Sequence, residues 1–338
     1  MKRKWIIPLT IGVAVLVGVL LMRGWPQPGA TSAPPVSKAL PILDQPSGAA
    51  VALPAVSGSS APESDSERRR RFRDRIGASR DYFELIRHWL PAARAGDPEA
   101  EYSLFKALAY CQTSYRAFFT RRGESLTLSE GLQYATRRHL SLDIAQEVYD
   151  RCHALTPDAM AEFGNPAQWL DQSAAAGQPV AQAQIATQAL LQKFLARSAA
   201  ESGGSNPNEV DARLQNTDVS NLLNGALRSL DPDALFIIGE YYGIIAPGDA
   251  DADINGPAWI LVACQRGADC SSTSEWVKSA CVYDPQCMSF VGYADRLRNM
   301  TGDDAWPAVQ LRALELNEML DAGRWDELGI GQPSAERP

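Results

Sequence analysis

The chain has few of the residues, and none of the motifs, from which common active sites are built. It contains 3 histidines in 338 residues, and none of them forms an H-E-x-x-H metal motif. It has no G-x-S-x-G elbow, no Walker lysine loop and no glycine-rich dinucleotide fingerprint. We interpret His88, His139 and His153 as surface or half-buried helix residues. We therefore predict that the protein is not an enzyme and requires no cofactor.

Positive charge and strand-forming patterns are also scarce. The formal net charge is −8 and the sequence pI is about 5.1, which argues against a general nucleic-acid binder. No run of residues alternates apolar and polar side chains between hairpin turns, so we predict no sheet.

An uncharged apolar run follows the basic amino terminus. Residues 5–22 would span about 27 Å as a helix, close to the thickness of a bilayer core. The preceding lysines and arginine should stay in the cytoplasm. We predict a signal-anchor transmembrane helix over residues 1–23, with the bulk of the chain in the periplasm of a bacterial inner-membrane protein. A cleaved signal peptide is the alternative, with Ala30 and Ala33 as candidate cleavage sites.

The rest of the chain divides by composition. Residues 24–65 are rich in Pro, Ala and Ser and are predicted to form a disordered tether. Residues 66–328 are predicted to form the folded domain, and residues 329–338 a flexible tail. An arginine-rich run from Arg68 to Arg75 opens the domain, and we interpret it as a solvated helix rather than a lipid-headgroup site.

Helix start and stop signals recur through the predicted domain. A capping side chain precedes a proline at Asp97-Pro98, Thr156-Pro157, Asn165-Pro166, Asp231-Pro232 and Asp284-Pro285. Capping boxes are predicted at Thr127-x-x-Glu130 and Ser272-x-x-Glu275. Gly96, Gly177 and Gly267 stand where a helix should end in a left-handed residue. These signals predict an all-α fold.

One short sequence pattern recurs several times along the chain. Its two clearest copies are Ala92-Ala93-x-x-Gly96-x-Pro98-x-Ala100-x-x-x-Leu104 and Ser173-Ala174-x-x-Gly177-x-Pro179-x-Ala181-x-x-x-Ile185. A partial copy runs from Asp231 to Tyr241, and a degenerate one follows Trp259. Repeated helix pairs indicate an α-solenoid, which is built as a binding surface.

The pattern resembles that of Sel-one-like repeats, which are relatives of tetratricopeptide repeats. The family has Leu-Gly four residues after the alanine that corresponds to Ala100 and Ala181. Here Leu104-Phe105 and Ile185-Ala186 stand in its place, and the repeat lengths vary. The resemblance therefore implies an irregular α-solenoid and a role in protein–protein interaction.

The chain's 6 cysteines suit an oxidising compartment. Cys111 and Cys152 each share a helical face with apolar residues at helical spacing, so we predict that they form a disulfide between neighbouring helices. The resemblance extends to a disulfide-stapled subclass of Sel-one-like proteins, which implies the pairs Cys264–Cys270 and Cys281–Cys287. The crossed pairs Cys264–Cys281 and Cys270–Cys287 are an alternative, as is a zinc site made by all four thiolates.

Two further candidates for chemistry are weak. Asp251, Asp253, Asn255 and the turn at Gly256, with Asp249 nearby, match the opening of a calcium loop. The bidentate glutamate expected at the end of such a loop is replaced by Val262, so a polar turn capping a helix at Pro257 is favoured. Glu240 could serve as the acid of a cell-wall lytic enzyme, but the expected surroundings are absent.

The sequence thus predicts a membrane-anchored periplasmic repeat protein that acts as a scaffold or adaptor for other envelope proteins. The alternative is an envelope enzyme or binding protein for peptidoglycan, with Glu240 or the Asp251 loop as its site.

Overall fold

A computed structural model describes residues 65–121, 124–201, 218–246, 249, 251–275, 277–278, 291–328 and 330. Every described residue belongs to one unit of the chain, residues 64–338. The predicted anchor, most of the predicted tether and tail, and both Cys281 and Cys287 lie outside the described residues. Within the described part of the chain, no helix combines the length and apolarity needed to cross a bilayer.

Most of the described residues are helical and very few lie in strands, which confirms the predicted all-α class. The first half contains α2 (Asp65–Ala78), α3 (Tyr82–Arg94), α4 (Pro98–Tyr110), the π-helical turn η1 (Cys111–Tyr115), α5 (Arg116–Phe119), α6 (Leu128–Arg137), α7 (Leu142–Cys152), α8 (Pro157–Phe163) and α9 (Pro166–Ala175). The second half contains α10 (Pro179–Glu201), α12 (Val219–Arg228), α13 (Pro232–Glu240), α14 (Tyr242–Ile245), α15 (Ala252–Gln265), α17 (Tyr293–Thr301), α18 (Trp306–Asp321) and the 3-10 turn η4 (Trp325–Leu328).

The prediction of no sheet was wrong at one place. Strands β1 (Thr120–Arg121) and β2 (Glu124–Ser125) pair antiparallel, with Thr120 opposite Ser125. Each strand has two residues, too few for an alternating pattern to be visible in the sequence.

Most predicted helix starts are confirmed. The Asp97 carboxylate accepts hydrogen bonds from the backbone N–H groups of Glu99 and Ala100, at 3.0 and 3.2 Å. Thr156, Asn165 and Asp231 cap α8, α9 and α13 in the same way. Thr127 and Glu130 form the predicted capping box.

The predicted helix ends are confirmed as well. Gly96, Gly177 and Gly267 have φ angles of +86°, +89° and +106°, which favour glycine because it has no Cβ. At Gly96 the backbone N–H bonds Ala93 O, and the next N–H reaches back to Ala92 O, which is the Schellman arrangement. The same pair of bonds recurs at Gly177, at Gly267 and at Gly323, which the sequence reasoning did not single out.

The prediction for the start of α15 was wrong. The helix begins at Ala252, and Pro257 lies inside it rather than at its first position. Within this helix the backbones of α13 and α15 approach closely. A Cβ built on Gly239 would lie 2.8 Å from Ile260 N and 3.0 Å from Gly256 O.

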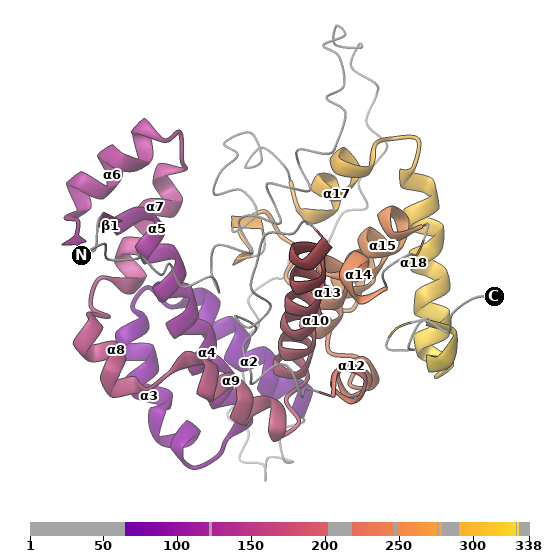
Figure 1. Cartoon of the computed structure of the whole chain (residues 1–338), viewed down its shortest axis with the longest axis horizontal. Coiled ribbons are helices and arrows are strands. Elements are labelled where there is room, and N and C mark those ends of the chain that lie inside the picture. Colours follow the sequence, from indigo (N-terminus) through magenta and orange to yellow (C-terminus); the bar gives the residue numbers. More distant parts are fainter. Residues whose placement is uncertain are drawn as a thin grey trace, which may run out of the picture. The chain divides into compact units, whose positions relative to one another are not determined.

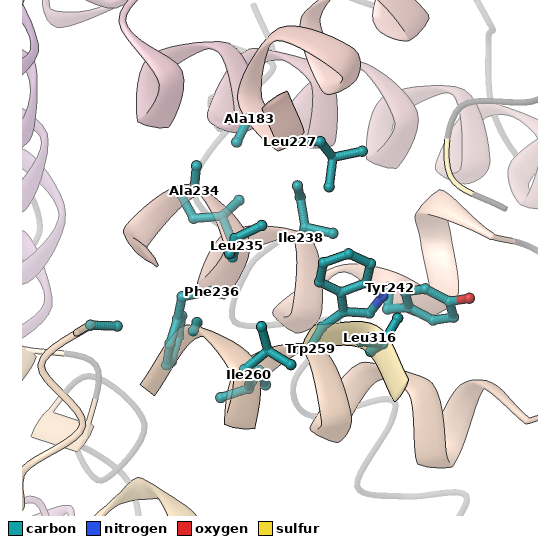
Figure 2. Packing of buried hydrophobic residues seen from close by; sticks show 14 of the residues in the cluster. Ala183, Leu227, Ala234, Leu235, Phe236, Ile238, Tyr242, Trp259, Ile260 and Leu316 are labelled. Atoms are coloured by element: carbon teal, nitrogen blue, oxygen red, sulfur yellow. The ribbon is translucent and has the colours of Figure 1, made fainter. Parts of the chain in front are cut away.

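The most extensive helix contacts follow the order of the chain but pass over α5 to α8 and α17. Extensive contacts join α3 to α4, α4 to α9, α9 to α10, α10 to α12 and α13, α13 to α15, and α15 to α18 (Figure 1). The largest buried cluster of apolar side chains lies among α10, α12, α13, α15 and α18. At its centre Trp259, 1% exposed, lies beside Tyr242 and Leu316 (Figure 2).

Two disulfides lie within the described residues. Cys111 bonds Cys152, with Cα atoms 5.3 Å apart, and links the end of α4 to the end of α7. Cys264 bonds Cys270, with Cα atoms 5.6 Å apart, and spans the turn at Gly267. Both pairs fit the predicted pairings; the crossed pairs and the four-thiolate zinc site are not formed, since Cys264 and Cys270 bond each other.

We predict that Gly239→Ala lowers the free energy of unfolding by about 2 kcal/mol, because the added methyl group meets backbone atoms of α15 that cannot rotate away. The matched control is Gly243→Ala, where a Cβ would meet nothing within 4 Å. Denaturant unfolding of both variants checks the prediction, and equal stabilities would contradict the close backbone approach.

Candidate functional site

Helix α2 and the amino-terminal ends of α4 and α13 enclose a small cavity. Its volume is about 30 Å³, which suffices for about two water molecules. Sites that bury a small-molecule substrate are at least ten times larger. The charges of the side chains around this cavity, and not its volume, therefore determine the chemistry of this region.

Four acidic side chains, which we call the acidic seam, meet beneath α2: Asp97, Glu99, Asp231 and Asp233. Two of them are there because they cap helices, Asp97 on α4 and Asp231 on α13. Gln178, which precedes α10, joins them by donating a hydrogen bond of 3.3 Å from its Nε2 to Glu99 Oε2. The starts of α4, α10 and α13 thus lie around one cavity.

Arginines of α2 neutralise the seam. Arg68 pairs with Asp97 at 3.2 Å, Arg69 with Asp231 at 2.8 Å and Arg73 with Asp233 at 3.0 Å. The interpretation of the arginine run as a solvated helix was therefore wrong for these side chains, while Arg70, Arg71 and Arg75 are exposed. Partners 160 residues away in the sequence leave no local signal that could have been found.

Burial changes the acidity of two seam carboxyls. Desolvation raises the pKa of Glu99 to about 7, against the opposing influence of the Gln178 hydrogen bond and of Arg69. Desolvation, assisted by the charge of Asp233, also raises the pKa of Asp231, although Arg69 acts against it. Negative charge in the seam is therefore unfavourable unless cations lie nearby.

A second cluster of charges, which we call the Arg151 network, borders the seam through Lys106, which also lines the cavity. The Arg151 guanidinium donates to the Tyr82 hydroxyl at 3.0 Å and to the Glu275 carboxylate at 3.2 Å. Lys106 contacts the other Glu275 oxygen at 2.7 Å, and Glu147 contacts Arg151 at 2.8 Å. The network joins α3, α4 and α7 to the segment that contains residues 274–278.

Each charge of the Arg151 network has a counter-charge. Burial alone would raise the pKa of Glu275, but Lys106, Arg151 and the Tyr82 hydroxyl outweigh it and hold that pKa at about 2. Burial raises the pKa of Tyr82 well above its usual range. The network therefore holds fixed charges and a neutral phenol near pH 7, and none of these groups is poised to exchange a proton there.

Glu275 shows why sequence reasoning missed this network. We predicted that it caps a helix together with Ser272, but its two carboxylate oxygens bond Tyr82, Arg151 and Lys106 instead. Its partners come from three helices far away in the sequence. A capping box is a local signal, and the tertiary charge contacts override it here.

The candidate calcium residues are engaged with one another. The Asp249 carboxylate accepts hydrogen bonds from the Tyr242 hydroxyl at 2.9 Å, from Asn255 Nδ2 at 2.7 Å and from the Asp251 backbone at 3.0 Å. Asn255 Oδ1 accepts from Arg312 at 2.8 Å. No group of three His, Cys, Asp or Glu residues in the described ranges is placed to hold a metal ion, and Asp253 makes none of these bonds.

The remaining predicted residues lie apart from both charge clusters. Glu240 is exposed at the end of α13 and accepts a hydrogen bond from Tyr293, which is buried. His88 contacts Arg75, and His153 stacks on Tyr149 within its own helix end. His139 occupies a left-handed turn with φ of +56°.

Comparisons with protein-family models, with curated proteins and with solved structures give no match for this chain.

We predict that Glu99→Gln stabilises the protein at alkaline pH. The folded pKa of Glu99 is raised to about 7 from 4.5, so its favourable contribution is complete below about pH 4.5 and is lost as the pH rises through 7. The variant, which keeps an oxygen for Gln178, should be more stable than wild type by about 3 kcal/mol at pH 8. The difference should shrink toward pH 5. Urea unfolding between pH 5 and 8.5 measures it, and a difference independent of pH would contradict the assignment.

We predict that Glu275→Gln lowers the free energy of unfolding by about 3 kcal/mol, because it leaves buried cations without a counter-charge. The matched control is Glu84→Gln, which breaks an exposed pair with Arg87 and should cost less than about 0.5 kcal/mol. Since the Glu275 pKa is lowered to about 2, its contribution is present above about pH 4.5 and is lost as the pH falls through 2. Denaturant unfolding at pH 7 and pH 3 tests this, and two variants of equal stability at pH 7 would rule the network out as a stabilising element.

Proposed function

We propose that the protein is a membrane-anchored periplasmic scaffold of Sel-one-like helical repeats that binds other proteins of the bacterial envelope. The observation that carries the proposal is the repeated junction between helices. A glycine with positive φ ends one helix, a capping residue follows, and a proline begins the next helix, at Gly96 to Pro98 and again at Gly177 to Pro179.

The order of helix contacts supports the same proposal. Extensive contacts follow the order of the chain from α3 through α4, α9, α10, α13 and α15 to α18, although they pass over α5 to α8 and α17 (Figure 1). In a solenoid each repeat packs on its neighbours in this manner, and the array offers an extended surface instead of one deep pocket. The cavity of about 30 Å³ beneath α2 is too small for a substrate, which agrees with a surface role.

The proposed location is supported by two kinds of feature. The apolar run over residues 5–22 follows a basic start, as in an inner-membrane anchor. The two disulfides, which persist in oxidising compartments, favour the periplasm for the helical domain.

Crosslinking in the native cells tests this function. The tagged full-length protein is crosslinked, purified and analysed by mass spectrometry beside a chain that keeps residues 1–65 and lacks residues 66–328. We expect a reproducible set of envelope proteins with the full chain that is lost with the shortened one. Retention on cell-wall material with no protein partner would refute the scaffold and favour a peptidoglycan-directed role.

A further inference from the structure

Helix α2 is attached to the rest of the domain by three ion pairs, by two apolar side chains and by a hydrogen bond of 3.0 Å from Arg151 to the Gly77 carbonyl. Its apolar contribution consists of Phe72, whose ring lies 4.9 Å from that of Trp89, and Ile76, which is 3% exposed. Its pairs with the acidic seam involve Arg68, Arg69 and Arg73, whose side chains are 35%, 21% and 23% exposed. Partly exposed ion pairs contribute little each and weaken as salt screens them.

The fit between α2 and the acidic seam is incomplete. Arg69 Nε lies 2.8 Å from an Asp231 oxygen, but without hydrogen-bond geometry. Asp233 Oδ1 is buried and has no hydrogen-bond partner among the described residues. The cavity of about 30 Å³ lies between these groups. The seam thus retains polar capacity that another basic occupant could satisfy.

The seam nevertheless requires a cationic occupant. Asp231 is 5% exposed at its side chain, and Asp233 and Glu99 lie close to it. Lys106 lines the same cavity and interacts with Asp233, but without the arginines the carboxylates would outnumber the cations in this poorly solvated place, which is unfavourable. The occupant must therefore bring positive charge together with a small apolar face.

We propose that the acidic seam is a docking site for a basic helix of a partner protein, and that α2 occupies it in cis as a replaceable ligand. The partner helix should carry two arginines four residues apart and apolar residues that follow each arginine by three positions. That is the arrangement Arg69-x-x-Phe72-Arg73-x-x-Ile76 of α2 itself. This inference rests on the proposed scaffold function and specifies the chemistry of one partner.

The proposal can be measured as competition for the seam between α2, which is tethered to it, and a free helix. A segment attached through a short connection acts at an effective concentration of about a millimolar. A free helix can bind only while α2 is away from the seam. Its apparent affinity is therefore its intrinsic affinity multiplied by the fraction of time that the seam is empty. Releasing α2 should tighten the binding of a free basic helix.

The test uses the full chain and a fluorescently labelled peptide of residues 65–80. One variant, Arg69→Glu with Arg73→Glu, releases α2. A second variant adds Asp231→Asn and Asp233→Asn, which remove charge from the seam, and Asn at position 231 still caps α13. We expect the peptide to bind the first variant at least about tenfold more tightly than wild type, and the second variant at least about tenfold more weakly than the first. A peptide with the same two Arg→Glu changes is the control and should not bind.

Hydrogen exchange over residues 65–78 reports the release of α2 independently of the peptide. The chain with Asp231→Asn and Asp233→Asn alone should exchange faster there than wild type, with an unchanged circular dichroism spectrum. Unchanged exchange in that chain, or equal peptide affinity of the wild-type and released chains, would overturn the proposal. So would equal binding of the charge-reversed peptide.

The crosslinking experiment separates this proposal from the function on which it rests. Envelope partners captured by the helical domain, without peptide binding, would leave the scaffold standing and remove the seam as its site. Peptide binding without any captured partner would overturn the scaffold function, and with it the assignment of the seam to a partner protein.

Discussion

The turn between consecutive helices is the constraint on which the rest of this structure depends. At Gly96 and Gly177 the chain enters the left-handed region, and the two Schellman hydrogen bonds close the preceding helix. One capping residue later the next helix begins. Since only about three residues separate the two helices, the second must fold back against the first, and the positions of the small residues Ala100 and Ala181 in the core follow from that geometry.

The same turns bring acidic side chains together, and the arginines of α2 neutralise them. A capping side chain is favoured at each helix start because it satisfies backbone N–H groups that the helix leaves open. Helix packing gathers the acids Glu99, Asp231 and Asp233 around one cavity, and Glu99 and Asp231 are buried there. Such a concentration of negative charge is unfavourable in a poorly solvated place. The arginines of α2 offset it, so a helix with little apolar surface gains a place in the fold through the caps of two other helices.

The Arg151 network shows a different use of buried charge. There the carboxylate of Glu275 meets Lys106 and Arg151 with a hydroxyl completing its shell, and its pKa is held at about 2. At the acidic seam, by contrast, Glu99 is raised to about 7 and Asp233 retains an unpaired oxygen. Each charge of the Arg151 network has a counter-charge, whereas the seam keeps a carboxylate oxygen without a hydrogen-bond partner among the described residues. For this reason we propose the seam, and not the network, as the site of binding.

The sequence by itself determined the helical class, the helix ends at Gly96, Gly177 and Gly267, and most helix starts, because capping and left-handed turns are decided within a few residues. Tertiary structure alone decided where Glu275 points, how closely the backbones of α13 and α15 approach, and which arginines of α2 are held by ion pairs. Each of these depends on groups that packing brings together from distant parts of the chain. Charges and close backbone contacts act through space, so local patterns carry no record of them.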